Sequence, residues 1–150
     1  MQNPPSDYDA KRVAHWREVL RANGYRITPT REAVLRALSA GDYALEATEI
    51  FERARRFAPH LGLVTVYRTL DAMLSLGLVE RVHCTGQCSL YVAAEEGHHH
   101  ILVCRKCRRV WHFSGDDLTN LMDDVANESG FVIEDHWLQL VGLCPECRDS

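Results

Sequence analysis

The sequence lacks any apolar run that approaches the roughly 20 residues of a membrane-spanning helix. Its N-terminus, MQNPPSDYDAKR, also lacks the apolar core of a secretory signal. We therefore expect a cytoplasmic protein with no membrane partner. In a reducing cytoplasm, its six cysteines are better explained as metal ligands or redox thiols than as a disulfide framework.

The chain also lacks an overall excess of positive charge, because its formal net charge is -4. The charge is unevenly distributed: residues 1–83 contain 12 Lys and Arg against 10 Asp and Glu, whereas residues 84–150 contain 5 against 11. A phosphate-binding surface needs only local positive charge, so this balance does not exclude DNA. With 46% hydrophobic and 25% charged residues, the composition is that of a globular protein with a core.

Apolar residues at helical spacing occupy most of the first half. The pattern predicts four helices: from Asp9 to Asn23, from Thr28 to near Gly41, around Ile50 to Phe57, and from Thr65 to Gly77. Asp9, Thr28 and Thr65 are each expected to cap a helix N-terminus. The last two helices are close together, which is typical of a helix-turn-helix variant. The β-rich runs LVERVHC and CSLYV then flank Thr-Gly-Gln and predict a hairpin wing.

The second half reads as a small α/β unit. Two strands, ILVC and RVWHF, precede a helix opened by Ser114 with Asp116 and Asp117 in its first turn, and FVIEDHWLQLVGL reads as a long strand. At about 50 residues this unit is small for an independent core, so we expect it to need a metal, a partner chain, or both. The fold class is therefore α+β: a winged-helix DNA-binding domain over 1–93, a hinge over 94–97, and an α/β dimerisation and metal-binding domain over 98–150.

Two CxxC motifs provide the strongest chemical signal. Cys104 and Cys107 form the first, and Cys144 and Cys147 form the second. Each motif can direct two thiolates at one ion, and together they predict a tetrahedral structural zinc site. Four protein ligands leave no position for water, which argues against a catalytic metal. The alternative, a redox dithiol, would need only one such motif.

A histidine triplet leads into the first predicted strand of the second domain. Because side chains alternate along a strand, His98 and His100 point one way and His99 the other. His83 and Cys88 lie near the ends of the two wing strands, so we expect a regulatory metal site made of His83, Cys88, His98 and His100.

Other cysteines and histidines leave alternatives open. Cys84 lies opposite Cys88 across the wing loop, so the two thiols either share the metal or form a redox pair. His136 is a candidate for a further site with His99 or one of its neighbours, and is equally well explained as a structural histidine. His15, His60 and His112 have no evident partners and are assigned to the surface.

The fourth helix carries the candidate DNA-reading residues. Residues at the start of a recognition helix reach base edges, so Thr65, Tyr67, Arg68 and Thr69 are expected to face DNA. Arg68 suits the O6/N7 edge of guanine. Arg26, Thr30 and Arg31 suit phosphates, although a solvated helix face is the better explanation for most of the arginines, with Arg68 the exception.

The segments GYRITPTREAVLRAL, GLVTVYRTLDAMLSLGLVERV, HHHILVCRKC and GFVIEDHWLQLVGLCPEC together strongly resemble the ferric uptake regulator family of metal-dependent repressors. The resemblance implies a homodimer that binds a palindromic operator, with metal at the hinge setting the two winged helices. Within the family, the zinc uptake regulators look most similar. Cys88 resembles their cysteine ligand, and soft sulfur favours zinc over ferrous iron. The sequence departs from the family at Ile101. This position lies three residues before Cys104, and the family commonly has a histidine there.

These observations predict a repressor, not an enzyme, with Zn²⁺ as structural metal and corepressor, controlling zinc uptake or homeostasis genes. One alternative is an iron- or peroxide-responsive regulator of the same family, with Fe²⁺ as the regulatory metal. A zinc enzyme or thiol oxidoreductase is an alternative from another class.

Overall fold

The computed structural model describes residues 9–84, 86, 88–115 and 118–150. Its first half is built from four helices: α1 (Ala10–Ala22), α2 (Pro29–Ser39), α3 (Ala47–Ala54) and α4 (Leu63–Ser75). The side chains of Asp9 and Thr28 cap α1 and α2 as predicted, each accepting a hydrogen bond from a backbone N–H three residues on. The predicted cap at Thr65 is wrong, because α4 begins at Leu63 with Gly62 as its N-cap and Thr65 lies inside the first turn.

A small antiparallel sheet completes the first half. It contains β1 (Leu45–Glu46), β2 (Val79–His83) and β3 (Ser89–Ala93) in the order β1-β3-β2. The β2–β3 pair is the predicted wing hairpin, although Thr85 and Gln87 of its turn lie outside the described residues. The apolar stripes of all four helices share one core with part of this sheet, so the helices and the wing form one packed unit.

The second sheet contains β4 (His100–Cys104), β5 (Val110–Phe113) and β6 (Gln139–Gly142), in the order β5-β4-β6. β5 runs antiparallel to β4, whereas β6 runs parallel to it. The predicted long strand over residues 131–143 is therefore mostly wrong, since only its last part pairs with β4. Residues 131–138 of this chain carry no strand.

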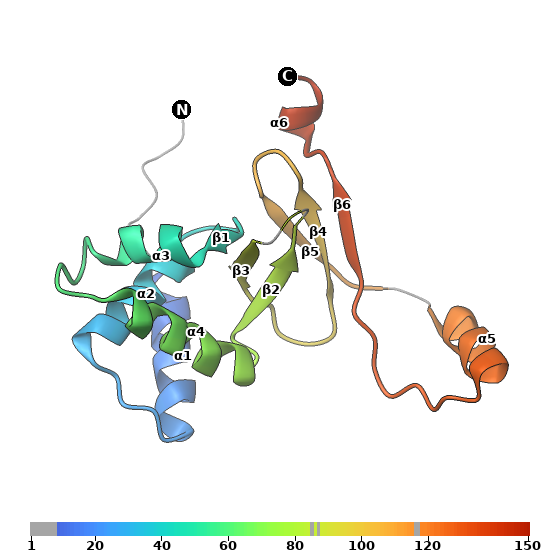
Figure 1. Ribbon diagram of the computed structural model, residues 1–150, viewed down its shortest axis with the longest axis horizontal. Coiled ribbons are helices and arrows are strands. Elements are labelled where there is room, and N and C mark those ends of the chain that lie inside the picture. The colour runs from blue at the N-terminus through green and yellow to red at the C-terminus, as the bar shows by residue number, and fades with distance from the viewer. Residues whose placement is uncertain (1–8, 85, 87, 116–117) are drawn as a thin grey trace.

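The second half also contains two helices, α5 (Thr119–Ser129) and the short α6 (Pro145–Arg148). Ser114 does not open α5 as predicted; the helix begins at Thr119 after Leu118, with no side-chain cap. Asp116 and Asp117, the predicted first-turn acids, lie outside the described residues. α5 buries none of its residues, and Figure 1 shows it standing away from both sheets at the right of the molecule.

The two halves contact each other through a second, smaller core. Val82, Leu90 and Val92 of the wing pack with Ile101, Val103, Val110 and Ala44. The segment before β1 also pairs with the segment before β5: the N–H of Ala44 donates to the carbonyl of Arg108 at 3.0 Å, and the N–H of Val110 donates to that of Asp42 at 2.7 Å. The wing is thus packed against the second sheet, as Figure 1 shows for β2, β3, β4 and β5. No helix among the described residues is long and apolar enough to cross a membrane.

Candidate functional site

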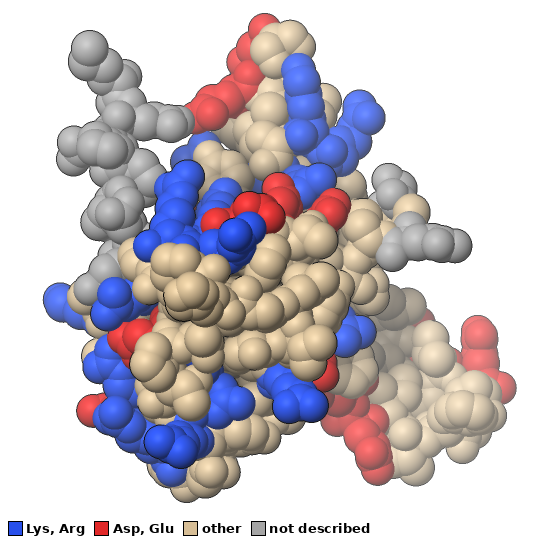
Figure 2. All heavy atoms as spheres, turned by 60° about the vertical axis from the view of Figure 1, so that its left-hand side comes forward, with Lys and Arg blue, Asp and Glu red and all other residues tan. Residues whose placement is uncertain are grey.

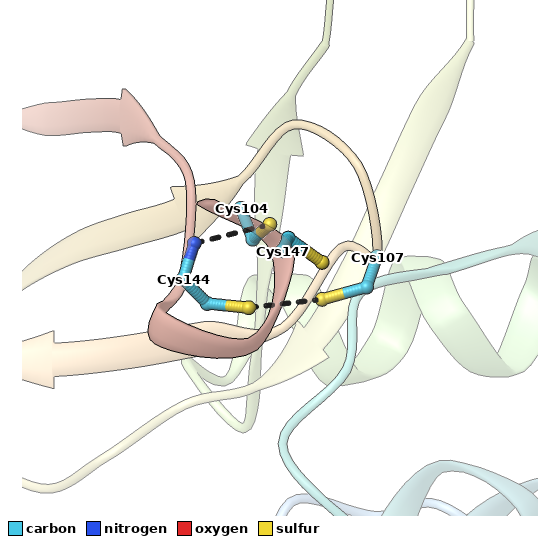
Figure 3. Close-up of side chains that lie close together, drawn as sticks. All are labelled: Cys104, Cys107, Cys144 and Cys147. Carbon is cyan, nitrogen blue, oxygen red and sulfur yellow. Dashed lines mark hydrogen bonds between the residues drawn. The ribbon is translucent and has the colours of Figure 1, made fainter. Parts of the chain in front are cut away.

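The four CxxC cysteines come together at one end of the second sheet. β4 and β6 are parallel neighbours that end opposite each other, at Cys104 and Gly142, so the turns that follow them lie side by side. The sulfur atoms of Cys104, Cys107, Cys144 and Cys147 all lie within 4.8 Å of one another. Figure 3 shows the four side chains directed toward a common centre.

The spacing of these sulfurs fits a zinc ion. The Sγ atoms of Cys107 and Cys144 are 3.7 Å apart. A tetrahedral zinc with sulfur ligands at about 2.3 Å has sulfur–sulfur edges of about 3.8 Å, which agrees with this distance. Four sulfurs fill the coordination shell, so the arrangement suits a structural ion that ties the end of the chain to the β4–β5 turn.

The electrostatics of the group already favour one thiolate. Burial raises the pKa of the Cys104 thiol, but backbone hydrogen bonds, among them one from the N–H of Cys144 at 3.4 Å, outweigh it and lower that pKa to about 6. A hydrogen bond with Cys144 and desolvation raise the pKa of Cys147 to about 12. The N–H of Arg109 lowers the pKa of Cys107, but desolvation and hydrogen bonds with neighbouring thiols outweigh it and raise that pKa. Ionisation of one thiol thus disfavours ionisation of its neighbours. A bound cation would remove this repulsion and favour the thiolate forms.

A second group joins the start of β4 to the segment before β6. His98, His100 and His136 offer ring nitrogens within 4.8 Å of one another. The parallel register that pairs Ile101 with Gln139, continued back by three residues, places His98 beside His136. The predicted pairing of His98 with His100 on one side is thus present in the structure, and His136 lies beside these two rather than beside His99. Three imidazoles are a ligand set that suits zinc or ferrous iron.

A third group joins the two halves of the protein. Glu80 lies on β2 of the wing, His99 immediately precedes β4, and His112 lies on β5. The Oε2 atom of Glu80 lies 3.1 Å from Nε2 of His99 and 3.5 Å from Nε2 of His112. The Nδ1 atom of His99 is 2.9 Å from the carbonyl of Gly97, and a donor there leaves Nε2 free to act as a metal ligand.

The surroundings of this third group favour charged Glu80. The side chains of His99 and His112 are only 10% and 11% exposed. Burial raises the pKa of Glu80, but the ring nitrogens of His112 and His99 beside its carboxylate outweigh it and lower that pKa. The assignment of His112 to an unpartnered surface position is therefore wrong, because it is largely buried and contacts a carboxylate.

The structure does not bring His83 and Cys88 into either histidine group. His83 ends β2, where its backbone N–H donates to Oε1 of Gln139 at 2.9 Å and its carbonyl accepts from Nε2 of Gln139 at 2.8 Å. Cys88 forms a disulfide with Cys84, so neither sulfur is a thiolate ligand in this state. Of the two alternatives for these thiols, sharing a metal or forming a redox pair, this structure holds the disulfide.

Sequence reasoning missed Glu80 and His112 for different reasons. His112 could have been predicted from the sequence. The CxxC turn sets the β4–β5 register, which pairs His112 with Ile101, two residues after His99. Glu80 was not, because its approach to the histidines depends on how the wing packs against the second sheet.

The exposed face of α4 begins with apolar and hydroxyl side chains. Val64 and Tyr67 are 63% and 45% exposed, and Arg68 is exposed beside them. Thr65 is half-buried. Thr69 is fully buried, and its hydroxyl donates to the carbonyl of Thr65 at 2.7 Å, so the prediction that Thr69 faces DNA is wrong. Thr69 lies three residues after the buried Val66 and next to the buried Leu70, so it shares the face of α4 that packs into the helical core.

Three further predicted contacts lie around the start of α2. The Thr30 hydroxyl lies 3.1 Å from that of Thr28, and a guanidinium nitrogen of Arg31 donates to the carbonyl of Arg26 while the group stacks 5.7 Å from the ring centre of Tyr25. Arg26 is exposed and Arg31 is half-buried.

Figure 2 shows Lys and Arg gathered around the helical half of the molecule that comes forward, whereas acidic side chains dominate the far α5 end. This positive surface suits phosphate.

Comparison with known proteins gives a consistent family. The ferric uptake regulator family model matches residues 22–141. The chain is 36% identical to a zinc uptake regulation protein of Mycobacterium tuberculosis, over 85% of this chain and 98% of the relative. It is 31% identical to a ferric uptake regulation protein of Bacillus subtilis, over 91% and 95% of the two chains. A solved zinc uptake regulator complexed with zinc and DNA superposes with a TM-score of 0.74 at 27% identity, covering 93% of this chain and 94% of that one.

Proposed function

The chain belongs to the ferric uptake regulator family, and we propose that it is a zinc-responsive transcriptional repressor. In this proposal it binds palindromic operator DNA as a homodimer, with zinc as corepressor, and controls genes of zinc uptake or homeostasis. The four-cysteine ion is structural, and the regulatory ions occupy the two histidine groups.

The observation that carries the proposal is the position of the Glu80, His99 and His112 group. Glu80 belongs to the wing, whereas both histidines belong to the second sheet. A cation held by all three side chains stabilises the arrangement in which wing and sheet are packed together. Ligand binding to one arrangement shifts the population toward it by the difference in affinity, which is how a small ion can set the spacing of two recognition helices.

Zinc is supported over iron by similarity rather than by the ligand atoms. Imidazole and carboxylate ligands suit both ions, and Cys88, the soft ligand expected from the sequence, is disulfide-bonded away from the histidines. The chain is similar to a zinc uptake regulation protein and to a zinc uptake regulator solved with zinc and DNA. It is also 28% identical to a peroxide-responsive repressor of Staphylococcus saprophyticus, so Fe²⁺ is the alternative that the experiment must test.

The homodimer is supported by a large apolar surface on the second half. Phe131, Val132 and Trp137 are 76%, 88% and 87% exposed, and Trp111 on β5 is 69% exposed. α5 contributes no residue to the described core. Large apolar side chains exposed to this degree are expected to be covered by a partner, and a two-fold dimer would cover the same side chains on both copies. A palindromic DNA site follows from that symmetry.

The test is an operator-binding titration at buffered free zinc, measured by fluorescence anisotropy. We expect wild type to bind DNA only above a threshold zinc concentration. His99→Ala and His112→Ala should each raise that threshold by about tenfold or more, because each removes one ligand. The control is His60→Ala, which lies outside all three groups and should leave the threshold unchanged. Unchanged thresholds in both ligand variants would rule out this site as the zinc sensor.

The same titration with Fe²⁺ under anaerobic conditions decides between the two metals. Restoration of DNA binding by Fe²⁺ at concentrations where zinc has no effect would replace the zinc hypothesis with the iron-responsive one. The four-sulfur group has no open position for substrate or water, and for the two three-ligand groups a zinc enzyme is disfavoured because the similar proteins are regulators.

A further inference from the structure

We propose that Cys84 and Cys88 are a reversible thiol–disulfide site at the tip of the wing, which reacts with small anionic disulfides and weakens operator binding when oxidised. The effect on DNA rests on the proposed function, whereas the redox chemistry does not. No other pair of cysteines among the described residues is available for this role, because the remaining four converge on the zinc group.

The pair is formed by the geometry of the hairpin. β2 ends at His83 and β3 begins at Ser89, so the two cysteines face each other across a three-residue loop. Their Cα atoms are 6.5 Å apart and their sulfurs are bonded. This Cα separation lies within the range of about 4.4–6.8 Å that a disulfide spans without moving the backbone. The strand pairing that holds the loop therefore keeps the two thiols within bonding reach after reduction.

The two sulfurs differ in access. Cys88 is exposed, whereas Cys84 is half-buried and packs against the second core, which joins the wing to β4 and β5. The exposed thiol is the one an external reactant can reach. Cys88 is therefore the attacking cysteine, and Cys84 is the resolving cysteine held beside it.

The lining of the adjacent cavity indicates the class of reactant. Both cysteines line a cavity of about 710 Å³, together with Arg105, Gln139 and Cys104 of the four-cysteine group; Arg108 also lines it, but its guanidinium is paired with Glu46 and Glu49. The cationic side chain of Arg105 favours a thiolate nearby and attracts carboxylates. The geometry suits a low-molecular-weight disulfide that carries carboxylate groups, for which oxidised glutathione is a suitable probe.

The reaction is a two-electron exchange. The Cys88 thiolate attacks one sulfur of the small disulfide, forms a mixed disulfide and releases one small thiolate. The Cys84 thiolate then attacks the Cys88 sulfur, closes the protein disulfide and releases the second small thiolate. The protons of the two cysteines end on the two released thiols, so the protein is oxidised by two electrons and the small disulfide is reduced to two thiols.

The cysteine pair lies next to a contact between the wing and the second sheet. The residue before Cys84 is His83, whose backbone forms two hydrogen bonds with the side chain of Gln139 at the start of β6. The disulfide ties Cys84, which directly follows this contact, to Cys88 at the start of β3, so the adjoining ends of β2 and β3 are fixed more tightly against the second sheet. A wing fixed in this way cannot adapt to the DNA backbone, and operator affinity should fall.

The experiment equilibrates the zinc-loaded full chain in buffers of reduced and oxidised glutathione, quenches with acid, and maps free thiols by alkylation and mass spectrometry. We expect Cys84 and Cys88 to form one disulfide while the zinc content is unchanged, and dithiothreitol to reverse it. Cys88→Ser should abolish the reaction. Cys84→Ser should stop it at the mixed disulfide on Cys88, a product that a merely structural cystine would not yield.

Operator binding is then measured on the same samples at saturating zinc. Oxidation should weaken wild-type binding by about tenfold and should leave the Cys84→Ser, Cys88→Ser double variant unaffected. Zinc loss before any Cys84–Cys88 disulfide forms would overturn the redox site. Equal affinity of both wild-type forms would overturn its regulatory role. If reduced wild type shows no zinc-dependent binding at all, the proposed function fails instead, and the thiol mapping still decides the redox site.

Discussion

The guanidinium of Arg108 lies 2.8 Å from the carboxylate of Glu49. This contact joins the β4–β5 turn, which carries Cys107, to helix α3 of the first half. Arg108 directly follows Cys107, and its other guanidinium nitrogen lies 3.4 Å from Glu46. Glu49 also accepts a hydrogen bond from the N–H of Glu46 at 2.8 Å as part of the capping box of α3. One carboxylate thus serves both a helix cap and the contact between the two halves.

Arg108 adopts a left-handed backbone conformation with φ of 64°, the only described residue other than glycine with positive φ. Arg108→Ala and Arg108→Gly both remove the ion pair, but only glycine accepts this conformation without strain. We expect the glycine variant to be about 1 kcal/mol more stable than the alanine variant in urea unfolding. Equal stability of the two would show that the strain is relieved elsewhere. Glu49→Gln is the matched control, because it removes the charge while leaving the turn unchanged.

Zinc binding at the four cysteines should release protons. At pH 7.5, Cys104 with its pKa of about 6 is already a thiolate in the metal-free protein, whereas Cys147, with its pKa of about 12, and Cys107, with its raised pKa, are still protonated. Zinc binds thiolates, so its affinity should fall as the pH is lowered. Calorimetry in buffers of different ionisation enthalpy measures the protons released. Cys147→Ser should release fewer protons, and an unchanged count would contradict the assignment.

The ion pair between Arg17 on α1 and Glu32 on α2 should make the free energy of unfolding depend on pH. The hydrogen bond from Arg17 lowers the pKa of Glu32 below its ordinary value of 4.5. Its stabilising contribution is therefore present above pH 4.5 and is lost as the pH falls through the lower, folded-state pKa. Glu32→Gln should cost about 1 kcal/mol at pH 7 and less at pH 3, measured by thermal unfolding. A constant cost across this range would contradict the prediction.

Arg68 and Thr69 are neighbours in α4 with opposite environments. Arg68→Ala should weaken binding to the operator by about 1–3 kcal/mol and reduce its preference over unrelated DNA, as expected for a base contact. Thr69→Val should leave that preference unchanged, because its side chain is fully buried. Competition binding with operator and unrelated DNA at fixed salt measures both. A loss of preference in the Thr69 variant would contradict the assignment.

Trp137 is 87% exposed in the single chain and is expected to be covered in the dimer. Trp137→Lys places a charge in that interface and should shift the protein toward monomer at micromolar concentration. Sedimentation velocity measures the shift. The control is Glu52→Lys on α3, a charged exposed position in the first half of the molecule. A dimer of unchanged strength in the Trp137 variant would place the interface elsewhere.

Short-range patterns in the sequence determined much of the fold. Asp9 and Thr28 cap their helices through backbone contacts only three residues away, so composition and spacing predicted them. The wing hairpin and the four-cysteine group were also predicted, because a CxxC turn directs its own thiolates whatever surrounds it. The predicted caps at Thr65 and Ser114 failed because each helix begins about one turn away from the residue expected to cap it.

Only the tertiary structure decided which histidines act together. The parallel pairing of β6 with β4 brings His136 beside His98 and His100, although 36 residues separate His136 from the nearer of the two along the chain. The packing of the wing against the second sheet brings Glu80 to His99 and His112. Cys88 is bonded to Cys84 across the wing loop instead of lying among the imidazoles. The physical reason is that spacing along the chain fixes neighbours within one turn or hairpin, whereas a ligand set drawn from two sheets depends on how their faces pack.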